Sequence, residues 1–77
     1  MKVKIYTSPT CQWCDKTKEF FKENNVEYEE VDVVKDPKGR EEVIAKSGQM
    51  GVPVTLIGGK VIVGFDEDEL KKALKLN

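Results

Sequence analysis

Residues 5–14 read Ile5-Tyr6-Thr7-Ser8-Pro9-Thr10-Cys11-Gln12-Trp13-Cys14 and hold both cysteines of this 77-residue chain. The β-branched and aromatic residues from Val3 to Tyr6 indicate a strand, which the turn-forming residues of 7–10 end. Apolar or small residues then recur at helical spacing from Gln12 to about Asn24. The cysteines therefore lie where the first predicted strand meets the first predicted helix.

Five further elements follow along the chain, joined by short turns. We expect a strand from Val26 to Val34, whose interleaved acids indicate an exposed or edge position. Asp36-Pro37 opens a second helix, because proline suits the first helical position, and Ser47-Gly48 ends it. The rest comprises a strand from Pro53 to Ile57, a Gly58-Gly59 turn, a strand from Lys60 to Val63, and a helix from Asp66 to about Leu76.

The order βαβαββα predicts an α/β fold. The first crossover should give a parallel strand pair, and the hairpin should add antiparallel strands. A four-stranded mixed sheet with three helices on its two faces follows. We find no repeat or linker-like run, so residues 1–77 are expected to form a single domain.

Composition disfavours several classes of function. Thirteen Lys and Arg against fourteen Asp and Glu give a net charge of −1, whereas nucleic-acid binding draws on a basic excess. No apolar run approaches the roughly 20 residues of a membrane span, and the start of the chain does not resemble a signal segment, so we expect a cytoplasmic protein. The absence of histidine excludes Cys-His and Ser-His nucleophiles and histidine-containing zinc sites within the chain.

The position of the cysteines predicts thiol chemistry. The first N–H groups of a helix lack intrahelical partners, and the helix dipole adds positive charge, so a thiolate at Cys11 is favoured. Lowering a thiol pKa from ~8.5 to ~5 requires about 5 kcal/mol, and the dipole supplies only about 0.3–2, so the N–H groups of Trp13 and Cys14 should bind the sulfur directly. Gln12, unlike a proline, keeps its own N–H. We expect Cys11 to be the nucleophile and Cys14 the resolving thiol.

Three other interpretations of the cysteine pair compete with this one. A structural disulfide closing a four-residue loop is worth only ~1.9 kcal/mol in the chain-entropy account and would be reduced in the cytosol. Two thiolates make half of a zinc or iron–sulfur site, which a second chain or external thiols would have to complete. Two core cysteines without a function form the third alternative.

The sequence resembles the glutaredoxin family along nearly its whole length. Ile5-Tyr6-Thr7 followed after three residues by Cys-x-x-Cys is similar to the opening of that family. The segments Arg40-Glu41-Glu42-Val43-Ile44, Ser47-Gly48 and Val52-Pro53 look like its second helix and following strand. Ile62-Val63-Gly64-Phe65-Asp66 looks like its Ile-Gly-Gly-Cys-Asp segment.

This resemblance implies the thioredoxin fold and a substrate site beside the cysteines. Pro53 would be a cis-proline facing them, leaving the backbone of Val52 free to pair with an extended thiol such as glutathione; alternatively Pro53 only starts a strand. Asp66 would hold the γ-glutamyl ammonium or serve only as a helix N-cap. Trp13 would offer an exposed apolar contact or pack into the core. The expected substrate-binding residues are Gln12, Trp13, Gly51, Val52, Pro53, Gly64, Phe65 and Asp66.

The chain also departs from the family pattern. Ser8 and Gln49 stand where glutathione-using members often have basic residues, and Gly51 replaces a threonine. Lys38, Arg40 or Lys46 would have to supply the missing positive charge. Gly64-Phe65 instead resembles the redoxins that donate electrons to ribonucleotide reductase and are recharged by thioredoxin reductase, although the arginine and proline of their motif are absent.

The expected function is reduction of protein or glutathione mixed disulfides through a Cys11-Cys14 dithiol cycle. We expect a monomer with no bound metal or cofactor, glutathione as co-substrate, and glutathione or thioredoxin reductase and disulfide-containing proteins as partners. The alternatives are an electron donor for ribonucleotide reductase and a dimer that binds an iron–sulfur cluster through Cys11 of each chain and two glutathione thiols.

Overall fold

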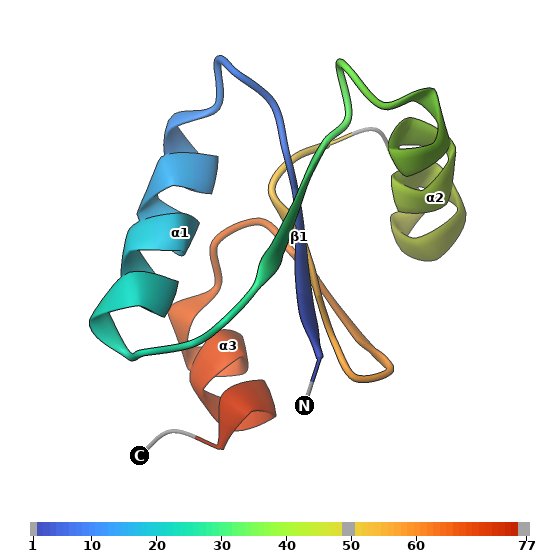
Figure 1. The fold of residues 1–77 in the computed structure, drawn as a ribbon. Helices are drawn as coiled ribbons and strands as arrows, with labels where there is room; N and C mark the ends of the chain where they lie inside the picture. Colours follow the sequence, from blue (N-terminus) through green and yellow to red (C-terminus); the bar gives the residue numbers. More distant parts are fainter. Residues whose placement is uncertain (1, 49–50, 76–77) are drawn as a thin grey trace.

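The computed structural model describes residues 2–48 and 51–75 (Figure 1). The predicted order βαβαββα is confirmed within them. The elements are β1 (Val3–Thr7), α1 (Gln12–Glu23), β2 (Glu29–Asp32), α2 (Pro37–Ser47), β3 (Val54–Ile57), β4 (Lys60–Val63) and α3 (Glu67–Leu74).

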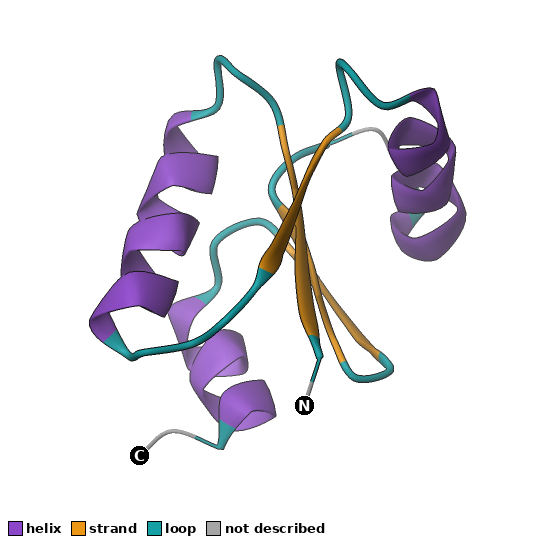
Figure 2. Cartoon of the chain, in the orientation of Figure 1, coloured by secondary structure: helices purple, strands orange, loops and turns teal. Residues whose placement is uncertain are grey.

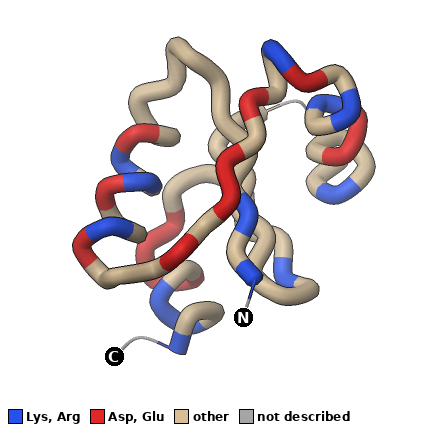
Figure 3. Tube along the Cα trace, viewed as in Figure 1, with Lys and Arg blue, Asp and Glu red and all other residues tan. Residues whose placement is uncertain are grey.

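The four strands form one mixed sheet in the spatial order β2-β1-β3-β4 (Figure 2). β1 and β2 are parallel, whereas β3 pairs antiparallel with both β1 and β4. The predicted four-stranded mixed sheet and the edge position of β2 are thus confirmed. This edge is acidic: Glu29 and Glu30 of β2 are exposed to solvent, and Figure 3 shows the acidic residues of the strand in red.

Helices cover both faces of the sheet, with α1 and α3 on one side and α2 on the other (Figure 1). The core under α1 and α3 contains Val3, Ile5, Phe20, Phe21, Ile57, Ile62 and Leu70. The core under α2 is smaller and contains Tyr6, Val33, Val43 and Val54. Successive residues of β1 supply the two cores, because side chains of a strand alternate between the faces of its sheet.

Helix α2 is fixed to the sheet by a polar contact and a close approach. The buried Tyr6 hydroxyl and the Lys4 ammonium both donate to Glu42, the second over 2.8 Å. Gly39 is buried where a Cβ atom would collide with Cγ1 of Val31. Glycine at this position therefore lets the first turn of α2 lie directly against β2.

The second strand is shorter than predicted. The sequence indicated Val26 to Val34, but β2 spans Glu29–Asp32, because its ladder with β1 extends only from Lys4 to Thr7. The carboxylate of Asp32 then accepts the N–H groups of Val34 and Lys35 and turns the chain toward α2.

Helix boundaries follow the predicted capping residues. Asp36 caps α2 by accepting the N–H groups of Lys38 and Gly39, and the helix ends at Gly48, whose φ of 76° is left-handed. The last helix begins one residue later than predicted, because Asp66 is its N-cap, and it ends at Leu74. The predicted end near Leu76 lies outside the described residues.

Within the part of the chain that the structure describes, no helix has the length and apolar character needed to cross a membrane.

Candidate active site

The register of the sheet brings three segments that are distant in sequence to the same end of the sheet. Tyr6 pairs with Val54, which pairs with Val63, so the residues one step beyond this row lie together. Those residues are Thr7, the last residue of β1 before the loop to the cysteines, together with Pro53 and Gly64. A hydrogen bond of 2.8 Å from the Gly64 N–H to the Pro53 carbonyl joins the last two. The candidate site is therefore built at the carboxyl end of β1.

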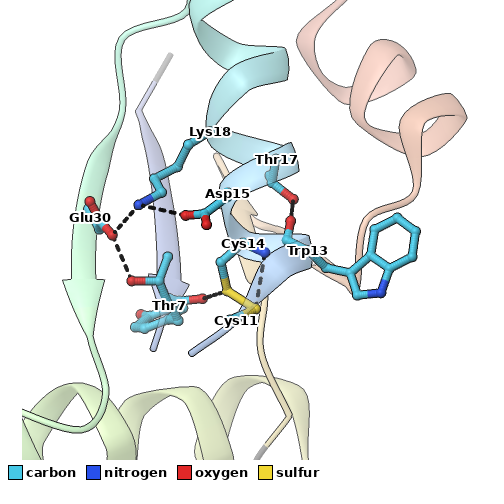
Figure 4. Close-up of a disulfide and its surroundings, with 9 residues drawn as sticks. Thr7, Cys11, Trp13, Cys14, Asp15, Thr17, Lys18 and Glu30 are labelled. Carbon is cyan, nitrogen blue, oxygen red and sulfur yellow. Dashed lines mark hydrogen bonds and ion pairs between the residues drawn. A yellow bond between two sulfur atoms is a disulfide. The ribbon is translucent and has the colours of Figure 1, made fainter. Parts of the chain in front are cut away.

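Cys11 is the N-cap of α1. Its Sγ accepts the N–H of Cys14 over 3.0 Å, and its side chain is only partly buried. The two cysteines form a disulfide with a Cα–Cα distance of 5.2 Å (Figure 4). Sulfur thus takes the place that a serine or aspartate oxygen has in an ordinary helix cap, and the predicted N–H donor from Cys14 is present.

Cys14 is buried, with 1% of its surface exposed. Its Sγ lies 4.0 Å from the Tyr6 carbonyl oxygen, in the first turn of α1 and against β1. The two sulfurs therefore differ in access: an incoming molecule can reach Cys11, and Cys14 faces the protein interior.

The aromatic side chain between the cysteines points outward. Trp13 is 55% exposed and stacks on Phe65, with ring centroids 6.1 Å apart and planes at 25°. The Lys16 ammonium lies 5.4 Å from the Trp13 ring centroid. Packing into the core, the alternative considered for Trp13, does not occur. Gln12 is also exposed at the start of α1.

A hollow of about 240 Å³ lies beside the first turn of α1. It is lined by Trp13, Val52, Pro53, Gly64 and Phe65. The Val52-Pro53 peptide bond is cis, as the resemblance implied, and Pro53 precedes β3. Five of the predicted substrate-binding residues thus form one mainly apolar surface. Sequence reasoning named them from three separate segments, and the sheet register brings those segments together.

The other predicted residues have different surroundings. Gly51 is exposed, and the Asp66 carboxylate accepts the Glu69 N–H over 3.2 Å as the cap of α3. Gln49 lies outside the described residues. Lys46 lines a hollow with Lys2 and Gly58 at the amino end of β1, opposite the cysteines.

Sequence analysis missed a charged network on the other side of the disulfide (Figure 4). The buried Thr7 hydroxyl donates to Glu30 over 2.8 Å, and the Lys18 ammonium donates to the same Glu30 oxygen over 3.1 Å. Lys18 also lies 3.6 Å from the Asp15 carboxylate. These contacts lower the pKa of Glu30, chiefly through the Thr7 hydrogen bond, and raise that of Lys18, chiefly through its hydrogen bond to Glu30.

One sequence signal pointed to this network. Lys18 follows Cys14 by four residues, so the two share a helix face. The partner Glu30 could not be found in the same way, because its position depends on the pairing of Ile5 with Glu30 between β1 and β2.

No group of three or more His, Cys, Asp and Glu side chains within residues 2–48 and 51–75 is arranged to hold a metal ion.

The sheet order, the helices on both faces and a Cys11–Cys14 disulfide at the start of α1 define a thioredoxin-fold protein with a Cys-x-x-Cys site. The family model described as Glutaredoxin matches residues 3–62. The chain belongs to the glutaredoxin family, whose members are thiol–disulfide oxidoreductases and generally work with glutathione and reductases.

Known relatives agree with this assignment. The chain is 48% identical over 73 residues to a glutaredoxin-like 8.6 kDa protein of the rubredoxin operon of Clostridium pasteurianum, covering 95% of this chain and 97% of that one. The crystal structure of a glutaredoxin from Archaeoglobus fulgidus has a TM-score of 0.88 at 33% identity, covering 96% and 86% of the two chains. The NrdH-redoxin from Escherichia coli, described as a glutaredoxin-like protein with a thioredoxin-like activity profile, has a TM-score of 0.86 at 28% identity, covering 94% and 93%.

Proposed function

We propose that this protein reduces disulfides of proteins and of glutathione adducts through a Cys11-Cys14 dithiol cycle. The observation that supports this most directly is the difference between the two sulfurs. Cys11 Sγ caps α1, accepts an N–H at 3.0 Å and is partly accessible, whereas Cys14 is 1% exposed. A hydrogen-bonded, accessible sulfur at a helix start suits a nucleophilic thiolate, and a buried neighbour suits a resolving thiol.

The cycle has two exchange steps. The Cys11 thiolate attacks one sulfur of the substrate disulfide, so that a mixed disulfide forms and the first substrate thiolate leaves. Cys14 then attacks Cys11 Sγ, the intramolecular disulfide forms and the second substrate thiol is released. Two electrons pass from the dithiol to the substrate, and no bound cofactor takes part.

The apolar surface beside Cys11 is proposed as the substrate-binding wall. Its hollow of about 240 Å³ accepts a side chain of the substrate against Trp13 and Phe65, while the backbone of Val52 beside Pro53 pairs with an extended substrate segment. Gln12, Gly51 and Asp66, each next in sequence to a residue of this surface, complete the proposed contacts.

Glutathione is the proposed reductant of the oxidised protein. The proposal relies on backbone contacts at Val52 and on Asp66, because Ser8 supplies no charge and Lys46 lies at the far end of β1. We also propose that the protein acts as a monomer in the cytoplasm, where reducing systems return such dithiols to the reduced state.

A second candidate is an electron donor for ribonucleotide reductase that is recharged by thioredoxin reductase. Two features favour it: the Gly64-Phe65 pair at the site, and similarity to the NrdH-redoxin, which is a glutaredoxin-like protein with a thioredoxin-like activity profile.

One experiment separates the candidates. Turnover of a single disulfide substrate is measured with NADPH and either glutathione with its reductase or thioredoxin reductase. We expect turnover with glutathione; turnover with thioredoxin reductase alone would support the second candidate. Visible absorbance after anaerobic purification tests the remaining alternative, a cluster-bridged dimer, and we expect none.

A further inference from the structure

The buried thiol of the proposed cycle needs a charge environment that lets it react. Cys14 attacks as a thiolate, and a thiolate is disfavoured at a position with 1% exposure unless positive charge or hydrogen-bond donors lie nearby. Within the described residues the Cys14 sulfur lies 4.0 Å from the Tyr6 carbonyl oxygen, which is an acceptor and does not stabilise a thiolate. Stabilisation must therefore come from elsewhere.

The side of α1 that carries Cys14 also carries Lys18, one turn further along. Residues four apart on a helix have Cβ atoms about 5–6 Å apart, so the stem of Lys18 begins beside Cys14. Its ammonium is held by hydrogen bonding to Glu30 over 3.1 Å and lies 3.6 Å from Asp15. Only 26% of the Lys18 side chain is exposed, which restricts where its charge can move.

The network is tied to the strand on which Cys14 packs. The Thr7 hydroxyl donates to Glu30 over 2.8 Å, and Thr7 follows the residue whose carbonyl faces the Cys14 sulfur. The charged side chains facing this corner are Asp15 and Lys18 from α1 and Glu30 from β2, with Asp32 two residues further along β2. Figure 4 shows the first three and Thr7 around the disulfide.

We propose that Lys18, whose positive charge is partly offset by Glu30, is a positioning residue that promotes attack of Cys14 on the mixed disulfide at Cys11. This inference rests on the proposed dithiol cycle. The reaction it accelerates is Cys14–SH plus Cys11–S–S–R giving Cys11–S–S–Cys14 plus R–SH. The S–S bond between Cys11 Sγ and the substrate sulfur breaks, the S–S bond between Cys11 and Cys14 forms, and the proton released by Cys14 reaches the departing thiolate through solvent.

The charge balance predicts effects of opposite sign for the two partners. Lys18→Met leaves Asp15 and Glu30 unneutralised and so disfavours the thiolate. Glu30→Gln keeps an oxygen that accepts the Thr7 hydroxyl but removes one negative charge, so it favours the thiolate. A network that served only to hold α1 against β2 would weaken the contact in both variants and change the rate in one direction.

The test measures both exchange steps in one reaction. Reduced protein is mixed with excess dipyridyl disulfide, a neutral probe that releases one coloured thiopyridone when Cys11 attacks and a second when Cys14 resolves the adduct. We expect Lys18→Met to slow the second release about two- to fivefold near neutral pH and Glu30→Gln to speed it by a similar factor, with the first release unchanged. Lys18→Arg should retain most of the wild-type rate.

Matched controls carry the same charge changes elsewhere. Lys22→Met alters the next turn of α1, and Glu29→Gln alters the neighbouring residue of β2, whose side chain points to the α2 face. Neither should change the second release. Excess reagent reacting directly with Cys14 is recognised because that rate grows with reagent concentration, so rates are extrapolated to low excess.

The outcomes separate this inference from the proposed function. The role of Lys18 would be overturned if Lys18→Met and Glu30→Gln both left the rate of the second release unchanged, or both changed it in the same direction. Either result would leave the dithiol cycle intact. Loss of the two-step release in the wild-type protein would overturn the cycle itself.

Discussion

Trp13 stacks on Phe65 with ring centroids 6.1 Å apart, although the two residues lie far apart in the sequence. Phe65 in turn meets Phe20 edge to face at 6.1 Å, so the exposed ring at the active site is connected to the core under α1. An aromatic ring supported in this way offers a substrate an apolar surface that costs little side-chain entropy to use.

Removing the Trp13 ring should weaken substrate binding more than it slows the chemistry. We expect Trp13→Ala to raise KM for a protein-disulfide substrate about three- to tenfold with little change in kcat, because it removes an apolar contact made equally in ground and transition states. Steady-state kinetics measure this. Val34→Ala removes another exposed apolar side chain, which does not line the hollow, and should leave KM unchanged.

The two cysteines should respond differently to substitution. Cys11→Ser should abolish turnover, since the attacking sulfur is lost. Cys14→Ser should lose reduction of protein disulfides and accumulate a mixed disulfide on Cys11, while glutathione-dependent exchange, which needs one thiol, continues. Mass spectrometry of the trapped adduct checks this result. Retained turnover in Cys11→Ser would show that the roles are assigned wrongly.

Asp66 allows its two predicted roles to be separated. Asp66→Ala should destabilise the fold by about 1 kcal/mol, because α3 loses the cap that accepts the Glu69 N–H over 3.2 Å. Asp66→Asn keeps a capping oxygen but removes the charge, so stability should be nearly unchanged. If the carboxylate also binds the γ-glutamyl ammonium, Asp66→Asn should raise KM for glutathione. An unaltered KM would leave capping as the role of Asp66.

A side chain at position 39 should destabilise the fold. A methyl group there would collide with Cγ1 of Val31, and α2 would have to move away from β2. We expect Gly39→Ala to lower the free energy of unfolding by about 1–3 kcal/mol despite the higher helix propensity of alanine. Thermal and urea unfolding measure this; Ala45→Gly, at an exposed position of the same helix, provides the opposite exchange as a control.

Glu30 should make stability depend on pH on the acid side. Hydrogen bonds from Thr7 and Lys18 lower its pKa below the ordinary 4.5, so the folded state binds this proton less readily than the unfolded state. The contribution is fully present above that ordinary value and is lost as pH falls through the folded pKa. The stability difference between wild type and Glu30→Gln should therefore shrink below about pH 4.5. A difference that stays constant with pH would contradict this linkage.

Much of the fold was determined by local sequence. Asp36 before Pro37, and Gly48 after Ser47, gave both ends of α2, because capping depends on the chemistry of adjacent residues. The hairpin from Val54 to Val63 followed in the same way from Gly58-Gly59 between two β-branched runs. The predicted length of β2 was wrong. Composition favours a strand as far as Val34, but the pairing with β1 and the turn at Asp32 end it at Asp32.

The features of the candidate site can be separated in the same way into those set by local sequence and those set by tertiary structure. The sequence by itself determined that two cysteines stand at the start of a helix, where free N–H groups meet a sulfur, because strand, turn and helix signals all lie within residues 5–24. Only the tertiary structure decided that Trp13 faces solvent on Phe65, that Lys46 lies away from the cysteines, and that Glu30 reaches Lys18 beside Cys14. These relationships depend on strand register and on which face each side chain occupies, and both are fixed when the sheet packs between its helices.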